Sequence, residues 1–140
     1  MYPHGPQAGD GPGVPEARRR ALSELADRLD PTSIDRIWIF PPLVRGRRER
    51  GLLALSLYRD GSPDRSLVSL RYTAELTGKG VEYSSDLVEE GDAGSDRLPR
   101  VIEGVARRSE GAVAGDPRLV AIEGSLELFT GLLSEGNDEH

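Results

Sequence analysis

The clearest pattern in the chain is an alternation of apolar and polar residues over residues 66–76. In a β-strand, successive side chains point to opposite faces, so this segment predicts a strand with one buried and one solvent-exposed face. The alternation resumes after a hairpin signal at residues 77–80 and continues to residue 87. Residues 34–40 and 52–59 predict two further strands, because each is a short, largely apolar run bounded by turn residues.

Apolar residues at three- and four-residue intervals predict helices on both sides of this strand region. The first helix covers residues 14–29 and ends before Pro31, since the residue before a proline disfavours the α conformation. The second helix begins near Leu98, with Ser95 or Asp96 as its N-terminal cap.

The remaining segments have shorter patterns. Residues 89–95 are polar and contain two glycines, so they predict a loop. Residues 119–122 fit either a fifth strand or an extended connector. Residues 126–133 again show helical spacing and predict a last helix, with Ser125 as its cap.

These elements predict an α+β fold in a single domain over residues 14–134. Its sheet is a four- to five-stranded antiparallel meander, because consecutive strands joined by short connections pair with each other. The N-terminal helix and the two C-terminal helices are expected to pack against one face of that sheet. Residues 1–13 are rich in Gly and Pro and are expected to form a disordered tail, and residues 135–140 a polar tail.

The composition excludes several kinds of functional site. The 140-residue chain contains no cysteine, which excludes disulfide scaffolds, thiolate metal sites and cysteine nucleophiles. Its two histidines are His4 and His140, so we expect no catalytic histidine held in a rigid core. The carboxylates between residues 82 and 96 lack the spacing of an EF-hand, and neither a P-loop nor a G-x-G-x-x-G motif is present. We therefore expect no metal and no cofactor.

Charge is distributed unevenly along the chain. The formal net charge is -6, which argues against non-specific binding to nucleic acids. Residues 1–80 carry 13 basic and 10 acidic side chains, whereas residues 81–140 carry 5 and 14, so the two parts can attract each other within one fold or between two copies. All basic residues except Lys79 are arginines, whose planar guanidinium groups suit bidentate recognition of carboxylate and phosphate. A GC-rich genome is an alternative explanation for this arginine content.

Residues 38–51 form the most distinctive segment, with the only tryptophan, a double proline and four arginines. The segment predicts a hairpin loop longer than strand geometry requires, and long loops in compact domains are often functional. Strand alternation places Trp38 and Phe40 on the same face, where they need a covering helix or a partner. The alternative is a solvated arm with Trp38 or Phe40 in the core. The candidate partner- or anion-binding residues are Arg45, Arg47, Arg48, Arg50, Trp38 and Phe40.

We therefore expect a non-catalytic protein-interaction module, acting as an adaptor, accessory subunit or homodimer through its arginine-rich arm. Nucleic-acid or phosphate-ligand binding through the same arm is one alternative, which the net charge disfavours. A small-molecule binder or an enzyme without cysteine or histidine chemistry is another, although no catalytic residue can be assigned. No apolar run approaches the ~20 residues of a membrane-spanning helix, and no signal peptide is apparent, so we expect a cytoplasmic protein that does not enter a membrane.

Overall fold

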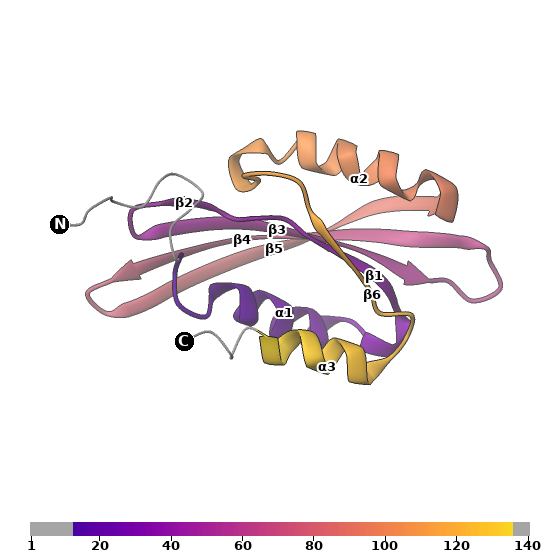
Figure 1. The fold of residues 1–140 in the computed structure, drawn as a ribbon, viewed down its shortest axis with the longest axis horizontal. Helices are drawn as coiled ribbons and strands as arrows, with labels where there is room; N and C mark the ends of the chain where they lie inside the picture. The colour runs from indigo at the N-terminus through magenta and orange to yellow at the C-terminus, as the bar shows by residue number, and fades with distance from the viewer. Residues whose placement is uncertain (1–12, 136–140) are drawn as a thin grey trace.

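Six strands form one antiparallel sheet in the computed structural model, which describes residues 13–135 (Figure 1). Their order across the sheet is β5-β4-β3-β1-β6, and β2 also pairs with β3. This arrangement confirms the α+β class and the antiparallel sheet. The strands are β1 (Ile34–Ile39), β2 (Leu43–Arg45), β3 (Arg48–Tyr58), β4 (Asp64–Thr77), β5 (Gly80–Gly94) and β6 (Arg118–Ala121).

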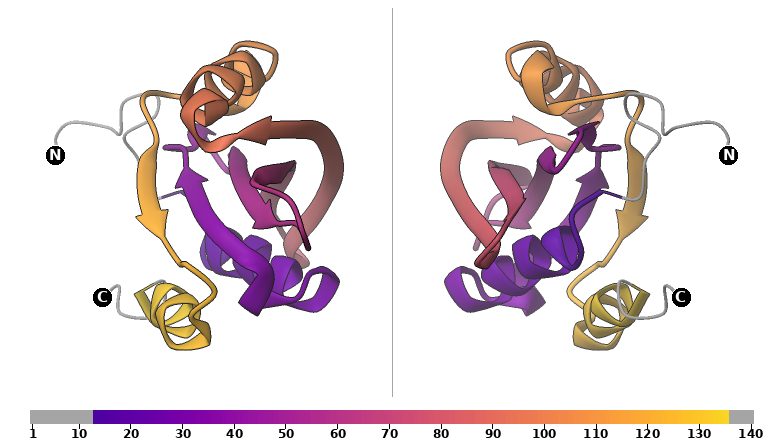
Figure 2. Two further views of the ribbon diagram at one scale, coloured as in Figure 1. Left: turned by 90° about the vertical axis from the view of Figure 1, so that its right-hand side faces the viewer. Right: turned by 90° about the vertical axis from the view of Figure 1, so that its left-hand side faces the viewer.

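Helices cover both faces of the sheet. Helices α1 (Ala17–Arg28) and α3 (Leu126–Glu135) lie on one face, and α2 (Leu98–Arg107) lies on the other (Figures 1 and 2). The expectation that all helices share one face was wrong. The reason is that the two central strands β1 and β3 are apolar on both sides and need cover on both.

The two faces carry separate hydrophobic cores. The first core lies under α1 and α3 and includes Ile37, Leu53, Leu55, Leu70, Leu22, Leu25, Phe129 and Leu132. The second core lies under α2 and includes Trp38, Phe40, Leu52, Ala54, Leu67, Leu98, Ile102 and Val105. Alternate residues of β1 and β3 therefore enter opposite cores, as the period of two in a strand requires.

Strand β5 is longer than expected, and residues 89–94 are not a loop. Leu67 pairs with Gly91 and Val68 with Glu89, so Glu90 is an extra residue that bulges from the ladder. The Glu90 carboxylate accepts hydrogen bonds from the Ser69 hydroxyl at 2.5 Å and from Arg108 at 2.8 Å. A bulge bends its strand, and β5 curves strongly at the edge of the sheet (Figure 2).

Residues 118–121 settle the choice between a strand and a connector, because they form β6. This strand pairs antiparallel with β1, with Trp38 opposite Leu119.

The expected cap of α2 was wrong, since Ser95 and Asp96 belong to a 3-10 turn, η2 (Ser95–Arg97), and no side chain caps the helix. The expected cap of α3 is confirmed, because the Ser125 hydroxyl accepts a hydrogen bond from the Leu128 N–H at 3.2 Å.

Two buried or half-buried carboxylates attach α1 and its preceding turn to the sheet. The Glu49 carboxylate accepts hydrogen bonds from the Val14 N–H at 2.8 Å and the Tyr72 hydroxyl at 2.5 Å. Glu24 accepts hydrogen bonds from Ser85 and Tyr83 of β5. Helix α1 therefore begins at Ala17, after a turn held by Glu49, rather than at residue 14. Of the two expected tails, residues 1–12 and 136–140 lie outside the described residues, and Glu135 belongs to α3 rather than to the C-terminal tail.

Candidate functional site

The arginine-rich segment is a β-hairpin rather than a long loop. Strand β2 continues the line of β1 along β3, and Pro41 and Pro42 interrupt the ladder between them because proline has no N–H to donate. A two-residue turn at Gly46 and Arg47 joins β2 to β3, with Gly46 at a φ of 60°. Positive φ at the first turn residue alone is the pattern of a type II′ turn, which matches the twist of the paired strands. Strand β3 therefore starts at residue 48, not at residue 52.

Three of the four candidate arginines share one face of this hairpin. Arg45 lies directly opposite Arg48, and Arg50 follows two residues later on the same face. The intervening Glu49 points to the other face and is buried. All four candidate arginines, including Arg47 in the turn, are exposed. None of their side chains forms a hydrogen bond or ion pair with another residue in the described range 13–135.

A further arginine, Arg71 of β4, extends this surface. Arg71 pairs with Leu52, which belongs to the second core, so Arg71 lies on the same face as Arg50. Its Nε atom is buried and has no hydrogen-bond partner within the described chain. We call the surface formed by Arg45, Arg48, Arg50 and Arg71 the arginine face. The sequence analysis did not select Arg71, although the alternation along β4 puts it on the polar side of that strand.

Carboxylates border the arginine face on the side of β5. Glu75 lies opposite Arg48 in the register, Glu82 lies opposite Glu75, and Asp86 lies opposite Arg71. Among the described residues, neither Arg48 with Glu75 nor Arg71 with Asp86 forms an ion pair. The positive surface is therefore compact and is bordered by Glu75 of β4 and by Glu82 and Asp86 of β5.

Trp38 and Phe40 are not part of this surface. They are 5% and 3% exposed and lie beneath α2 in the second core. The sequence analysis expected either a helix or a partner to cover these two residues, and the helix α2 covers them. The arginine hairpin extends beyond the end of α2 (Figure 1). The structure thus separates the six candidate residues into an exposed basic group and a covered aromatic pair.

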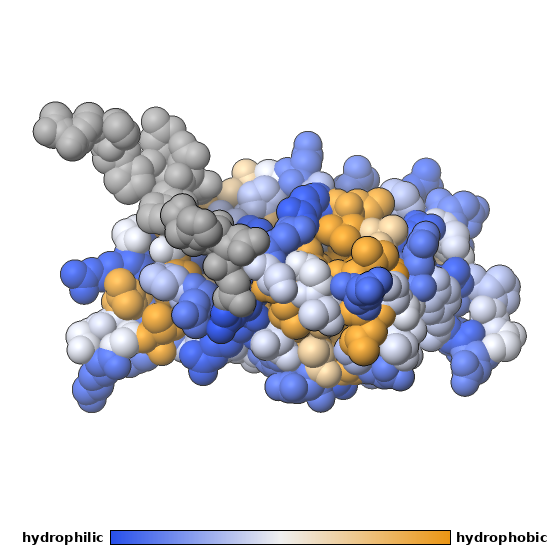
Figure 3. All heavy atoms as spheres, turned by 60° about the horizontal axis from the view of Figure 1, so that its bottom comes forward, coloured by the Kyte–Doolittle hydropathy of each residue, from blue (hydrophilic) through white to orange (hydrophobic). Residues whose placement is uncertain are grey.

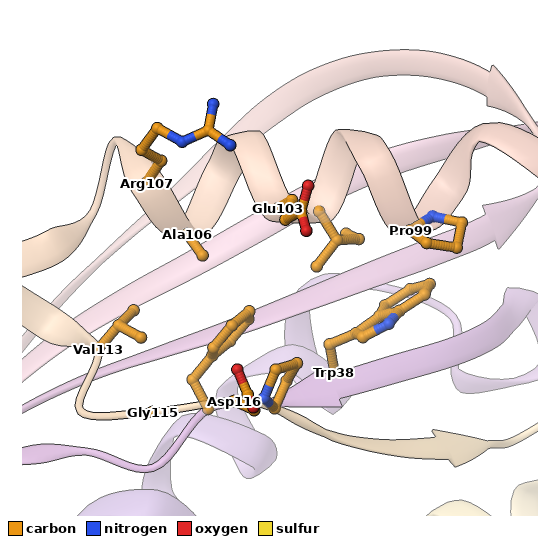
Figure 4. A pocket seen from close by; sticks show the side chains of 11 residues that line it. Trp38, Pro99, Glu103, Ala106, Arg107, Val113, Gly115 and Asp116 are labelled. Atoms are coloured by element: carbon orange, nitrogen blue, oxygen red, sulfur yellow. The ribbon is translucent and has the colours of Figure 1, made fainter.

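Trp38 and Phe40 are among the residues that line a cavity of about 540 Å³. Figure 4 shows this cavity, with Trp38 labelled. One wall is α2, which contributes Ile102, Glu103 and Ala106, and the other is the segment that runs from Val113 to Pro117. Sequence reasoning missed this cavity, because it depends on a segment that returns over β1 more than 70 residues later in the chain.

Other polar clusters are internally satisfied. Asp35 is 4% exposed and accepts hydrogen bonds from Arg65 at 3.0 Å and Ser56 at 3.3 Å. The Arg65 guanidinium also lies 4.7 Å from the centre of the Tyr58 ring. Burial and the nearby Asp35 carboxylate raise the pKa of Tyr58 above its ordinary value. Such a closed network of partners holds one end of the sheet together and offers no free group to a ligand.

Two further hydroxyl groups are held as neutral donors. Burial raises the pKa of Tyr72 far above its ordinary value, and the Glu49 carboxylate adds to this effect. Burial also raises the pKa of Tyr83, again with a contribution from its bonded carboxylate, Glu24. Neither tyrosine is therefore a base near neutral pH, and both serve to fix a carboxylate.

A small apolar area is exposed on the side where α3 lies. Leu126 and Leu128 of this helix are 55% and 51% exposed. Apolar side chains gather on the corresponding part of the surface in Figure 3. Within residues 13–135, no group of three or more potential metal ligands is assembled, and no helix is long and apolar enough to cross a membrane.

Comparisons with models of protein families, with curated proteins and with solved structures find no match to this chain.

Proposed function

We propose that this chain is a non-catalytic protein-interaction module that binds an acidic segment of a partner protein through the arginine face and Arg47. The observation that supports this proposal is the set of exposed guanidinium groups without partners in the described part of the chain. Guanidinium groups bind carboxylates through two parallel hydrogen bonds, which are among the stronger hydrogen bonds in proteins.

The pairing of Arg45 with Arg48 gives a physical reason for an anionic partner. Like charges directly opposite each other in a sheet destabilise it, so these arginines weaken the free hairpin. A carboxylate placed between them converts the repulsion into two attractions.

A short acidic protein segment fits this surface better than a nucleic acid. The carboxylates of Glu75, Glu82 and Asp86 border the positive surface and would repel a phosphate backbone that continued across β5. The net charge of -6 opposes binding of a long polyanion in the same way. An adaptor, an accessory subunit or a homodimer in the cytoplasm is consistent with this proposal, and the acidic residues after position 80 make a second copy one source of the acidic segment.

The test is fluorescence anisotropy of the full chain with two labelled probes. One probe is a peptide of alternating Asp and Glu, and the other is a single-stranded oligonucleotide with the same charge. Replacing Arg45, Arg47, Arg48 and Arg50 by Ser removes four exposed ion pairs of ~0.5 kcal/mol each, so peptide affinity should fall by about thirtyfold. The matched control replaces Arg97, Arg100, Arg107 and Lys79 by Ser, which changes the net charge equally.

The proposal requires that only the hairpin variant loses the peptide. Equal losses in both variants would show that net charge alone attracts the probe. An oligonucleotide that binds more tightly than the peptide, with an affinity that falls steeply with salt, would favour the nucleic-acid alternative instead.

A further inference from the structure

The cavity above Trp38 and Phe40 has the size and lining of a small-molecule site. Its volume of about 540 Å³ is within the range of pockets that bind small ligands. Trp38, Phe40 and Ile102 lie at its floor but are almost wholly buried, so half-buried Ala106 and Val113 provide much of its accessible apolar surface. The arginine hairpin does not contribute to this lining, so the cavity is independent of the function proposed above.

Two carboxylates stand on opposite walls of the cavity. Glu103 comes from α2, and Asp116 comes from the segment that faces it (Figure 4). Both residues are exposed, and neither carboxylate has an ion pair or hydrogen bond with any residue that the structure describes. The same two walls thus provide apolar surface near the floor and unneutralised negative charge near the rim.

Arg107 is the one cation among the lining residues. It follows Glu103 by one helical turn, yet no ion pair joins the two side chains within the described chain. Its guanidinium extends away from the aromatic floor in Figure 4. The charge that faces the cavity is therefore negative, with two carboxylates against one guanidinium that points elsewhere.

We propose that this cavity binds a small organic cation, an ammonium or guanidinium group carried on an apolar body. The apolar body lies against Ala106, Val113 and the small exposed parts of Trp38 and Phe40, where burial of its surface provides attraction. The cationic group lies between the carboxylates of Glu103 and Asp116, at the entrance of the cavity. An anionic ligand would meet two carboxylates at the entrance, and a neutral ligand would leave them unpaired.

Trp38 is the only tryptophan of the chain, so its fluorescence reports directly on occupancy of the cavity. The full chain is titrated with phenethylamine, with its neutral analogue 2-phenylethanol and with its anionic analogue 3-phenylpropionate. Phenethylamine should change the Trp38 emission in a saturable way and bind more tightly than both analogues. A capped Phe-Lys dipeptide carries the same cation as a protein side chain, and it should bind no more tightly than phenethylamine.

Charge-neutralising variants test the two carboxylates. Glu103→Gln and Asp116→Asn should each weaken phenethylamine binding by about two- to fivefold, the value of one exposed ion pair, and leave 2-phenylethanol unaffected. Glu127→Gln is the matched control, because Glu127 is exposed on α3 and does not line the cavity. It should bind phenethylamine as the unaltered chain does.

Three results would overturn the inference. Equal binding of phenethylamine and 2-phenylethanol would show that the cation is not recognised. Tighter binding of 3-phenylpropionate would assign the recognition to Arg107 instead. Binding of the dipeptide alone would make the cavity a contact for a protein side chain rather than a small-molecule site. Far-UV circular dichroism of each variant confirms that the fold is retained.

Discussion

Replacing Arg45 by glutamine tests the repulsion inferred within the arginine hairpin. Arg45 and Arg48 occupy directly opposed positions in β2 and β3. Two unit charges about 6 Å apart in a water-like dielectric repel each other by ~0.7 kcal/mol. Cross-strand like-charge pairs destabilise sheets by a similar amount, about 0.2–1 kcal/mol. Arg45→Gln should therefore raise the free energy of unfolding by about 0.5 kcal/mol at low salt.

The assay is urea unfolding followed by the fluorescence of Trp38, at low and high salt. Because salt screens exposed charges, the increase in the free energy of unfolding caused by Arg45→Gln should be smaller at high salt. Lys79→Gln is the control, because Lys79 lies at the tip of the β4–β5 hairpin and the variant has the same net charge. Arg45→Gln should also weaken capture of the acidic peptide. A loss of stability at low salt, or an equal gain in Lys79→Gln, would refute the reasoning.

Three further predictions concern the stability of the fold, each measured by chemical unfolding. Tyr72→Phe should lower the free energy of unfolding by about 1.5–3 kcal/mol, because buried Glu49 loses one of its two hydrogen-bond donors. An unchanged free energy of unfolding would contradict the role of Tyr72 in holding Glu49. Burial raises the pKa of Glu24, but its hydrogen bonds outweigh burial and hold that pKa below the ordinary value. The stability that Glu24 provides is therefore lost as the pH falls below about 4.3. Glu24→Gln should reduce the fall of the free energy of unfolding over this acidic range, and an unchanged fall would refute the role of Glu24. Phe129→Ala should cost about 3–5 kcal/mol, whereas Leu128→Ala on the exposed side of the same helix should cost less than about 0.5 kcal/mol; equal costs would contradict the packing of α3.

Local patterns predict the elements whose neighbours are close in sequence. The alternation of apolar and polar residues over residues 66–76 identified strand β4 and the side that packs under α1. Its other side is exposed only toward Glu75, because Leu67 and Ser69 are buried. The helical spacing in residues 126–133 and the cap at Ser125 are likewise local, and both are present in the structure. Such signals depend only on residues that are close together in the sequence.

Distant contacts account for what the sequence does not reveal. Residues 89–94 have the composition of a loop, yet they stay in β5 because Glu90 is held by Ser69 and by Arg108 of the α2 end. The hairpin of the candidate site shows the same limit. Four arginines are visible in the sequence, but the two-residue turn at Gly46 decides which of them share a face. The cavity requires α2 and the following segment to meet over Trp38, which no local pattern encodes.

The position of β6 has a consequence for how the protein folds during its synthesis. Strand β1 is the second strand from one edge of the finished sheet, and its outer neighbour consists of residues 118–121. On the ribosome, the outer edge of β1 stays unpaired until those residues emerge, although β3, β4 and β5 have already been made. An unpaired apolar edge is a template for pairing with another chain. Nascent chains that stop before β6 should therefore be the species that aggregate, and the pairing of β1 with β6 should be among the last steps of folding, since it joins residues more than 75 positions apart.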